Sequence, residues 1–296
     1  DFKFQHKAKK IRILDNLSTG NLYNINEYIN LPNVEFIKGD ITSLSTCEKC
    51  INGIDFISHQ AALGSVPRSI KDPISSNKVN ISGFLNILHL AKDMKIKRMV
   101  YAASSSTYGD SEKLPKKEDI IGNPLSPYAV TKYVNELYAQ VFSKNYNYHS
   151  IGLRYFNVFG PKQNLKGPYA AVIPLFISQI LDNKIPTING NGKTSRDFTF
   201  VSNVVQANIK SIFIEKIRKN HVMNIACGGR VSLIDLIKVI NKTLNKDIKP
   251  NFKDFRPGDV LHSQANISLA KKLIKYSPDI LFDQGIKLTI PFFQKQ

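Results

Sequence analysis

The chain has 296 residues, enough for one large domain or two of ordinary size. Its 42% hydrophobic and 22% charged content is that of a globular protein and excludes a disordered one. The 41 lysines and arginines exceed the 23 acidic residues, which gives a formal net charge of +18. Because the basic residues are scattered without a stripe of interleaved aromatics or a zinc-finger spacing, we expect no nucleic-acid partner.

Cysteine usage and hydropathy restrict the class further. Cys47 and Cys50 form a lone Cys-x-x-Cys pair, and no second pair or histidine pair completes a zinc site, so no metal is expected. The third cysteine, Cys227, makes the count odd and low, which fits a reducing compartment. No apolar run approaches the roughly 18 residues that cross a bilayer. We expect a cytoplasmic protein without a membrane partner.

In chain order, strand-like apolar runs alternate with helix-like segments. The runs are IRILDN, VEFIKGDI, IDFISHQAA, KRMVYAASSSTYG and HSIGLRYFNVFG, and SGFLNILHLAKDM and YVNELYAQVFSKNY are the clearest helices between them. This alternation predicts βαβ units and a parallel sheet. We expect an α/β, doubly wound (Rossmann) domain over residues 1–158. A smaller C-terminal α/β substrate lobe is expected over 159–296, where proline and glycine become more frequent, with some segments returning to the first domain.

Chemically useful residues follow the strand-like runs. Asp15, Asp40, Gln60 to Ala62 and Ser104 to Ser106 each close one run. In doubly wound sheets, ligands bind beyond the carboxyl ends of the strands. The recurrence of such residues at these ends therefore predicts a binding site there.

The usual opening of a dinucleotide fold is not in the sequence. A strand, a G-x-G-x-x-G turn and a helix normally precede the ribose-binding acid by about 20 residues. Asp15 is a suitable acid, but the chain starts too late to include that turn. A sheet without its central strand would leave buried backbone groups unpaired, at about 1–3 kcal/mol each. We therefore expect a fragment of a longer chain, lacking the first βα unit.

Tyr128 stands four residues before Lys132 in SPYAVTKYVNE. Residues four apart lie on the same face of a helix. An ammonium group next to a phenol favours the phenolate and lowers the tyrosine pKa from its ordinary value of about 10. The pair could therefore supply a phenolic base, although such a pair taken alone is more often a packed tyrosine and a solvated lysine.

Six motifs in order identify a family. AASSSTYG, SPYAVTKYVNE, LRYFNVFGP, YAAVIP, INGNGKTSRDFTFV and DFRPGDVLHS together span nearly the whole chain. The sequence resembles the extended short-chain dehydrogenase/reductases, specifically the nucleotide-sugar 4-epimerases. The stretches HQAALGSVPRS and ASSSTYGD make it most similar to UDP-N-acetylglucosamine 4-epimerases of the bacterial glycan type.

The resemblance implies a set of catalytic roles. Tyr128 would remove the proton from the sugar O4 while C4 gives hydride to NAD, through a transient 4-keto sugar. Lys132 would lower the phenol pKa and bind the nicotinamide ribose. Ser104 would hydrogen-bond O4, with Ser105 and Ser106 as further candidates. His59 is expected to be structural.

NAD is the implied cofactor and a UDP-sugar the implied substrate. Asp15 also fits NAD on chemical grounds, because a carboxylate accepts from a ribose 2′-hydroxyl and repels a 2′-phosphate. The implied cofactor-binding residues are Asp15, Asn16, Asp40, Ile41, Gln60, Ala61, Ala62, Asn80, Tyr128, Lys132 and Tyr155. The implied substrate-binding residues are Ser65, Ser104, Asn157, Ala171, Val172, Asn189, Arg196, Arg256, Asp259 and Ser263.

Ser263 bears on which sugar is used. Galactose-only members of the family carry a tyrosine at this place, which would clash with an N-acetyl group. We expect interconversion of UDP-GlcNAc and UDP-GalNAc, with UDP-Glc and UDP-Gal reacting more slowly. A homodimer is implied through the helix of Tyr128, whose other face carries Val134, Leu137 and Val141.

Other functions are compatible with parts of this pattern. UDP-glucose and UDP-uronate 4-epimerases share these motifs and remain open. A 4,6-dehydratase would need an Asp-Glu pair where Ser105 and Ser106 stand. A non-catalytic NAD-fold binding protein is the alternative of another class, and the intact serine, tyrosine and lysine set argues against it.

Overall fold

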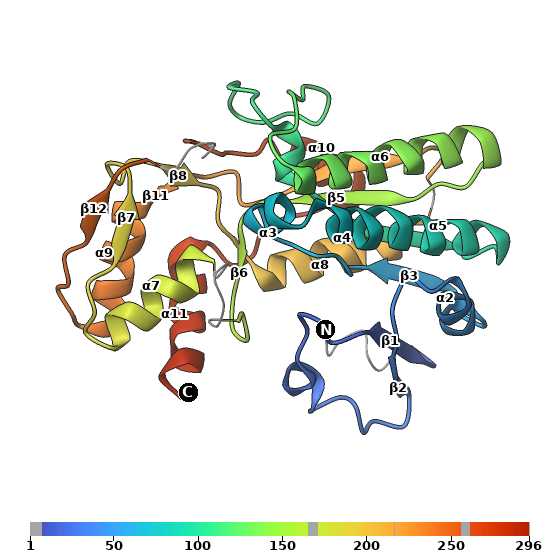
Figure 1. Ribbon diagram of the computed structural model, residues 1–296, viewed down its shortest axis with the longest axis horizontal. Coiled ribbons are helices and arrows are strands. Elements are labelled where there is room, and N and C mark those ends of the chain that lie inside the picture. Colours follow the sequence, from blue (N-terminus) through green and yellow to red (C-terminus); the bar gives the residue numbers. More distant parts are fainter. Residues whose placement is uncertain (1–7, 165–170, 216, 256–260, 296) are drawn as a thin grey trace. The chain divides into compact units, whose positions relative to one another are not determined.

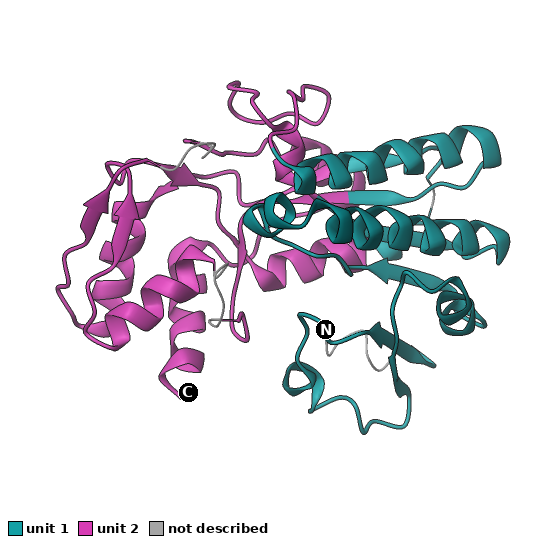
Figure 2. Cartoon of the chain, in the orientation of Figure 1, with its two compact units in different colours: residues 1–103, 126–152, 211–222 teal, residues 104–125, 153–210, 223–296 magenta. Residues whose placement is uncertain are grey.

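The computed structural model describes residues 8–164, 171–215, 217–255 and 261–295. The chain divides into two compact units that alternate along the sequence (Figure 2). Unit 1 comprises 1–103, 126–152 and 211–222, and unit 2 comprises 104–125, 153–210 and 223–296. The linear division after residue 158 expected from the sequence stays a prediction. In the described part of the chain, no helix has the length and apolar character needed to cross a bilayer.

The strands of unit 1 pair in parallel. β1 (Ile11–Asp15) lies beside β2 (Val34–Lys38), and β3 (Phe56–His59) lies beside β4 (Arg98–Ser104), with Phe56 opposite Arg98. The strand order of the four-stranded sheet is β10-β5-β4-β3, where β5 is Ile151–Tyr155 and β10 is His221–Ile225, and both of these strands end in unit 2. Figure 1 labels β3 and β5 of this sheet. The expected parallel α/β architecture is confirmed.

Helices follow the strands of unit 1 as the sequence pattern predicts. They are η1 (Leu22–Ile25), α2 (Leu44–Ile51), α3 (Val66–Lys71), α4 (Pro73–Asn77), the π-helical η2 (Lys78–Gly83), α5 (Phe84–Asp93) and α6 (Pro127–Tyr146). The long helix α6 packs against α3, α4, η2 and α5, and α5 also packs against α2. These contacts pack α6, which carries Tyr128, against helices of its own unit.

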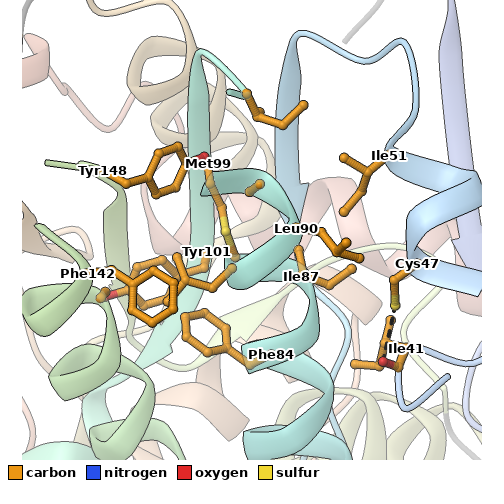
Figure 3. Packing of buried hydrophobic residues seen from close by; sticks show 14 of the residues in the cluster. Ile41, Cys47, Ile51, Phe84, Ile87, Leu90, Met99, Tyr101, Phe142 and Tyr148 are labelled. Carbon is orange, nitrogen blue, oxygen red and sulfur yellow. Dashed lines mark hydrogen bonds between the residues drawn. The ribbon is translucent and has the colours of Figure 1, made fainter. Parts of the chain in front are cut away.

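The core of unit 1 forms between α5, α2 and β4. Phe84, Ile87, Leu88 and Ala91 recur at helical spacing on the buried face of α5. They pack in one cluster with Met99 and Tyr101 of β4 and with Cys47 and Ile51 of α2 (Figure 3). Cys47 is fully buried and its thiol donates to the backbone oxygen of Ile41 at 3.2 Å. Burial raises the pKa of Cys47 to about 11, so this thiol is an inert packing group.

Unit 2 has short strands and longer helices. Its elements are η3 (Ser105–Tyr108), β6 (Val158–Phe159), α7 (Val172–Leu181), β7 (Thr187–Asn189), β8 (Ser195–Arg196), β9 (Thr199–Phe200), α8 (Val201–Ile212, ending in unit 1), β11 (Val231–Ser232), α9 (Leu233–Leu244), β12 (Asn251–Lys253), α10 (Ser268–Ile274) and α11 (Phe282–Gln294). The apolar faces of α7, α9 and α11 meet in one core that includes Ile177, Leu236 and Ile290. β7 pairs with β12 and β6 with β9 in parallel, whereas β8 and β11 are antiparallel. These contacts give unit 2 a core of its own.

Gly152 offers a test of packing in unit 1. A Cβ atom at this position would lie 2.6 Å from the ring of Tyr101, which is fully buried. We expect Gly152→Ala to lower the free energy of unfolding by about 1–3 kcal/mol, because a packed core resists added atoms. Urea unfolding followed by circular dichroism measures the change.

Gly64→Ala is the matched control, since a Cβ there would meet no heavy atom within 4 Å. Its free energy of unfolding should change by less than about 1 kcal/mol. Equal stability of the two variants would contradict the packing argument.

Candidate active site

The first turn of α6 carries the two central candidate residues. Ser126 caps the helix by accepting from the backbone N–H of Ala129 at 3.1 Å, and Pro127 occupies the first helical position. Tyr128 and Lys132 then fall one turn apart, with the lysine Nζ 5.9 Å from the centre of the tyrosine ring. The two side chains share a face of the helix, as their spacing predicts.

Buried polar side chains hold the backbone of Tyr128 from both sides. Its N–H donates to Ser69 Oγ at 3.0 Å, and its carbonyl accepts from Thr131 Oγ1 at 2.8 Å. Thr131 Oγ1 in turn accepts from Asn80 Nδ2 at 3.1 Å. Ser69, Asn80 and Thr131 are each at most 2% exposed. We call these four residues the α6 anchor.

Asn80 also fixes the loop after β3. Its Oδ1 accepts from the N–H of Leu63 at 2.7 Å, and its Nδ2 donates to the Leu63 carbonyl at 3.2 Å. Asn80 sits in the π-helical turn η2, a local irregularity that often accompanies functional sites. The Asn80 amide therefore positions both α6 and the loop that contains Ala61 and Ala62.

Lys132 is a buried cation. It is 3% exposed, and Nζ donates to the carbonyl of Ala102 at 2.8 Å. Burial lowers the pKa of Lys132 to about 8, so the group is mostly protonated at neutral pH but much less firmly than a surface lysine. Ala102 is the one acceptor for its three N–H groups in the described part of the chain.

His59 lies nearby but is neutral. Burial, aided by the charge of Lys132, lowers the pKa of His59 to about 3. Its ring packs edge-on against Phe84 with ring centres 5.6 Å apart. These contacts agree with the expectation that this histidine is a packing residue.

The residues after β1 and β2 come together in unit 1. Asn16 Nδ2 donates to Asp40 Oδ2 at 2.8 Å, and Asp15 Oδ1 accepts from the N–H of Leu17 at 2.7 Å. The hydrogen bond from the N–H of Thr42, aided by Asn16, lowers the pKa of Asp40 below its usual value. The two acidic residues and Asn16 thus form one polar edge.

The other unit 1 candidates follow β2 (Ile41) and β3. Ile41 is buried and accepts from Asn86 Nδ2 at 3.0 Å through its carbonyl. Gln60 is exposed and donates to Ser58 Oγ at 3.1 Å, whereas Ala61 and Ala62 are partly buried. Ser65 caps α3 with φ of 118°, a strained conformation for a residue with a side chain.

In unit 2, a small hydroxyl cluster ends β4. Ser104 is buried, and its Oγ accepts from the N–H of Ser106 at 3.1 Å and from Ser106 Oγ at 2.8 Å. Ser105 and Ser106 open η3 and are partly exposed. The structure therefore brings these predicted serines together through Ser104.

A second group of candidates in unit 2 surrounds Asp197. Asn157 Nδ2 donates to Ser263 Oγ at 3.3 Å and to the Asp197 carbonyl at 3.2 Å. Arg196 donates to the carbonyls of Ser195 and Leu261 at 3.0 and 3.1 Å. Three predicted substrate residues, Asn157, Arg196 and Ser263, are thus neighbours.

Asp197 itself was not among the site residues predicted from the sequence. Its buried carboxylate accepts from the N–H groups of Cys227, Gly228 and Ala265 at 3.0–3.1 Å. Burial raises the pKa of Asp197 to about 6 despite these donors. The available signal was an acidic residue directly after Arg196, at the start of the otherwise uncharged run DFTFV.

The remaining candidates are more dispersed within unit 2. The Tyr155 hydroxyl exchanges hydrogen bonds with Asn208 at 2.8 and 3.1 Å. Ala171 precedes α7 and Val172 opens it, without a side-chain cap, and Asn189 ends β7. Arg256 and Asp259 lie outside the described residues.

Comparison with known proteins identifies the family. The profile of the NAD dependent epimerase/dehydratase family matches residues 3–226. The chain belongs to this family. It is therefore an NAD-dependent epimerase/dehydratase with a Rossmann-like fold.

Individual members are similar over nearly their full length. The UDP-N-acetylglucosamine 4-epimerase of Methanobrevibacter ruminantium, solved with UDP-N-acetylmuramic acid, is 39% identical with a TM-score of 0.92, covering 97% of this chain and 91% of its own. The UDP-glucose 4-epimerase of Thermotoga maritima, solved with UDP-glucose, is 30% identical with a TM-score of 0.92, covering 99% and 94%. The UDP-glucuronate 4-epimerase of Thermodesulfobacterium geofontis is 31% identical, covering 96% and 88%.

The residues of this epimerase/dehydratase fit NAD. The buried ammonium of Lys132 bonds one carbonyl, that of Ala102, in the described part of the chain. Its other N–H groups can therefore donate to ribose hydroxyls. The carboxylates and amide after β1 and β2 suit an adenosine, since they offer acceptors and donors at one polar edge. Both observations concern unit 1.

Lys132→Met tests the burial of the lysine charge. The pKa of Lys132 is about 8 in the folded state and about 10.4 when unfolded. The unfolded chain therefore binds more protons between these values, and the stability of the native sequence rises with pH there. We expect the variant, without cofactor, to be more stable by up to about 3 kcal/mol below pH 8, because each factor of ten in proton affinity corresponds to about 1.4 kcal/mol.

This advantage should disappear as the pH rises from about 8 to 10.5, which urea unfolding across that range measures. Lys144→Met, at an exposed position of the same helix, should give no gain. A gain for Lys132→Met that does not change with pH would contradict the argument.

Proposed function

We propose that this protein is a UDP-sugar 4-epimerase that interconverts UDP-GlcNAc and UDP-GalNAc, and UDP-Glc and UDP-Gal more slowly. The observation that carries the proposal is the pairing of Tyr128 with the buried ammonium of Lys132 on an anchored helix turn. The similarity to the UDP-N-acetylglucosamine 4-epimerase of M. ruminantium supports the choice of sugar.

The proton chemistry would fall to residues of this chain. Tyr128, as phenolate, accepts the proton of the sugar O4, and the Lys132 charge stabilises that phenolate. Ser104 donates its own hydroxyl hydrogen to O4, because its Oγ already accepts two hydrogen bonds. NAD, when bound, supplies the hydride acceptor for C4.

The cofactor residues would divide into two groups. Asp15, Asn16, Asp40 and Ile41 hold the adenosine half. Gln60, Ala61, Ala62, Asn80, Tyr128, Lys132 and Tyr155 hold or position the nicotinamide half. Asn80 acts through the loop and helix that it fixes, since its amide is occupied by Leu63 and Thr131.

Substrate would be held chiefly by unit 2. Asn157, Arg196 and Ser263 form one hydrogen-bonded neighbourhood around Asp197. Ala171, Val172, Asn189, Arg256 and Asp259 complete the UDP contacts, and guanidinium groups suit diphosphate oxygens. Ser65 contributes to the sugar end.

A homodimer would use the outer face of α6. Leu137 and Val141 on this face are 41% and 46% exposed, which is high for large apolar side chains on a helix. Covering them with the same face of a second copy would remove this apolar surface from water.

UDP-glucose and UDP-glucuronate epimerases are the competing assignments, because relatives named for these activities are up to 35% and 31% identical to this chain. One experiment distinguishes them. Purified protein with added NAD is incubated with UDP-GlcNAc, UDP-GalNAc, UDP-Glc and UDP-glucuronate, and products are separated by chromatography. Fastest conversion of the N-acetyl pair supports the proposal, and no conversion despite bound NAD would favour a non-catalytic binding protein.

Tyr128→Phe removes the phenol and leaves the helix intact. Turnover should fall by about 10²–10⁴-fold, the contribution of a positioned general base. UDP binding, measured by calorimetry, should be retained. Tyr146→Phe, at an exposed position on the same helix, is the control and should leave turnover unchanged. A Tyr128→Phe enzyme with native turnover would refute the role of base.

Ser263→Tyr tests sugar selection. A bulky ring should reduce turnover of UDP-GlcNAc by at least about tenfold through steric exclusion, and should spare UDP-Glc. Ser263→Ala loses the hydrogen bond from Asn157 but keeps the space, so it should still accept the N-acetyl sugar. Undiminished use of UDP-GlcNAc by the tyrosine variant would remove the specificity argument.

A further inference from the structure

Asp197 is a buried acid that the proposed proton chemistry does not use. It is 1% exposed, and no lysine or arginine forms an ion pair with it among the residues that the structure describes. A buried carboxylate without a counter-ion is costly unless hydrogen bonds offset its desolvation. Although burial raises its pKa to about 6, the ionised form still predominates at neutral pH. The carboxylate therefore supplies something that a neutral side chain would not.

The segment that carries Ser263 lies beside β8 as a short parallel bridge. The N–H of Ser195 donates to the Leu261 carbonyl, and the N–H of Ser263 donates to the Ser195 carbonyl, both at 3.0 Å. In a parallel ladder, such a pair of bonds repeats two residues further along each strand. The next pair would join the N–H of Asp197 to the Ser263 carbonyl, and the N–H of Ala265 to the Asp197 carbonyl.

The side chain of Asp197 takes the place of that next pair. The N–H of Ala265 donates at 3.1 Å to Oδ2 of Asp197 and not to its carbonyl. The Asp197 carbonyl accepts instead from Asn157 Nδ2 at 3.2 Å, and the Asp197 N–H is directed at Ser263 Oγ, 3.5 Å away. Asn157 Nδ2 also donates to Ser263 Oγ at 3.3 Å. The carboxylate thus continues the ladder while the main chain of Asp197 faces the Ser263 side chain.

The other side of the same segment is held separately. The N–H of Lys116 donates to the Gln264 carbonyl at 2.7 Å, and the N–H of Asn266 donates to the Lys116 carbonyl at 2.9 Å. Because main-chain groups of successive residues in an extended chain point to opposite sides, the Ala265 N–H points away from Lys116. Asp197 is therefore the residue that holds the segment on the β8 side beyond Ser263.

A carboxylate suits this position better than an amide of the same shape. Oδ2 accepts from the N–H groups of Gly228 and Ala265, and Oδ1 accepts from that of Cys227. An asparagine has one oxygen and one NH2 group, so its NH2 would face at least one of these donors. At least one of the three main-chain hydrogen bonds would then be lost.

We propose that Asp197 is a positioning residue for sugar recognition, which fixes the place of residue 263 by holding the Ala265 N–H. The proposal rests on the proposed epimerase function, in which Ser263 lies beside the sugar. Asp197 acts through Ser263 and does not itself touch the substrate. The space left for an N-acetyl group then depends on where the backbone at 263 is held, as well as on the small size of serine.

Four proteins test this role: the native protein, Asp197→Asn, Ser263→Tyr and the variant with both changes. The measured quantity is the ratio of kcat/KM for UDP-GlcNAc to kcat/KM for UDP-Glc, with added NAD. Ser263→Tyr should lower this ratio by at least about tenfold. Adding Asp197→Asn should raise it again by at least about threefold, because the tyrosine is no longer held in the space of the N-acetyl group. A merely structural role of Asp197 would lower both rates by the same factor and leave the ratio unchanged.

Asp283→Asn removes the same charge from an exposed position of unit 2 and is the matched control. It should change the ratio by less than about twofold, alone or with Ser263→Tyr. Circular dichroism and urea unfolding establish that each variant is folded. If Asp197→Asn does not fold, Ala265→Pro replaces it, since proline has no N–H to donate to Asp197. The ratio in the Ser263→Tyr background should rise in the same way.

Three results would overturn the proposal. A double variant with the same ratio as Ser263→Tyr would remove the role of Asp197 and leave the epimerase assignment intact. Undiminished use of UDP-GlcNAc by Ser263→Tyr would show that residue 263 does not border the sugar. A native protein that converts no UDP-sugar despite bound NAD would remove the proposed function together with this inference.

Discussion

The α6 anchor is the constraint on which the proposed chemistry depends. Ser69 accepts from the N–H of Tyr128, and Thr131 donates to its carbonyl, so the peptide groups on both sides of the tyrosine are fixed. Losing the Ser69 bond would leave the N–H of Tyr128, in the first turn of the helix, without a helical acceptor, and an unsatisfied group costs more than the bond itself contributes. A phenol on such a backbone has little freedom beyond its own side-chain rotation. Asn80 extends this rigidity to the loop after β3.

Lys132 combines two opposing requirements. A charge close to Tyr128 must be poorly screened to favour a phenolate, which requires burial. Burial also weakens the hold of the lysine on its own proton, and lowers its pKa to about 8. At neutral pH the ammonium form still predominates, so Lys132 retains most of its charge. Because the group is buried, solvent screens the effect of that charge on Tyr128 only weakly. Its single carbonyl acceptor in the described chain leaves the ammonium able to take further partners.

Much of unit 1 could be anticipated because it follows from local pattern. Alternating strand and helix periods predict the parallel α/β architecture, and a four-residue spacing places Tyr128 and Lys132 on one face. The acidic and hydroxyl residues at strand ends follow from the same pattern. The sequence singled out Asn80 only as a cofactor residue and did not indicate its hydrogen bond to Thr131, since the two residues are 51 positions apart along the chain. The burial of Lys132 and the carboxylate of Asp197 depend likewise on neighbours that only tertiary packing supplies.

Asp197 has a consequence for how such an enzyme can diversify. One carboxylate ties the backbone at Cys227 and Gly228 to the backbone at Ala265, two residues beyond Ser263. Because Asp197 accepts from main-chain N–H groups, this connection does not depend on the side chains of the two segments. Residue 263 can therefore be exchanged while the backbone at Ala265 keeps its position. With the proposed role of Ser263 in sugar selection, a change of sugar preference would then not require the lobe to be rebuilt.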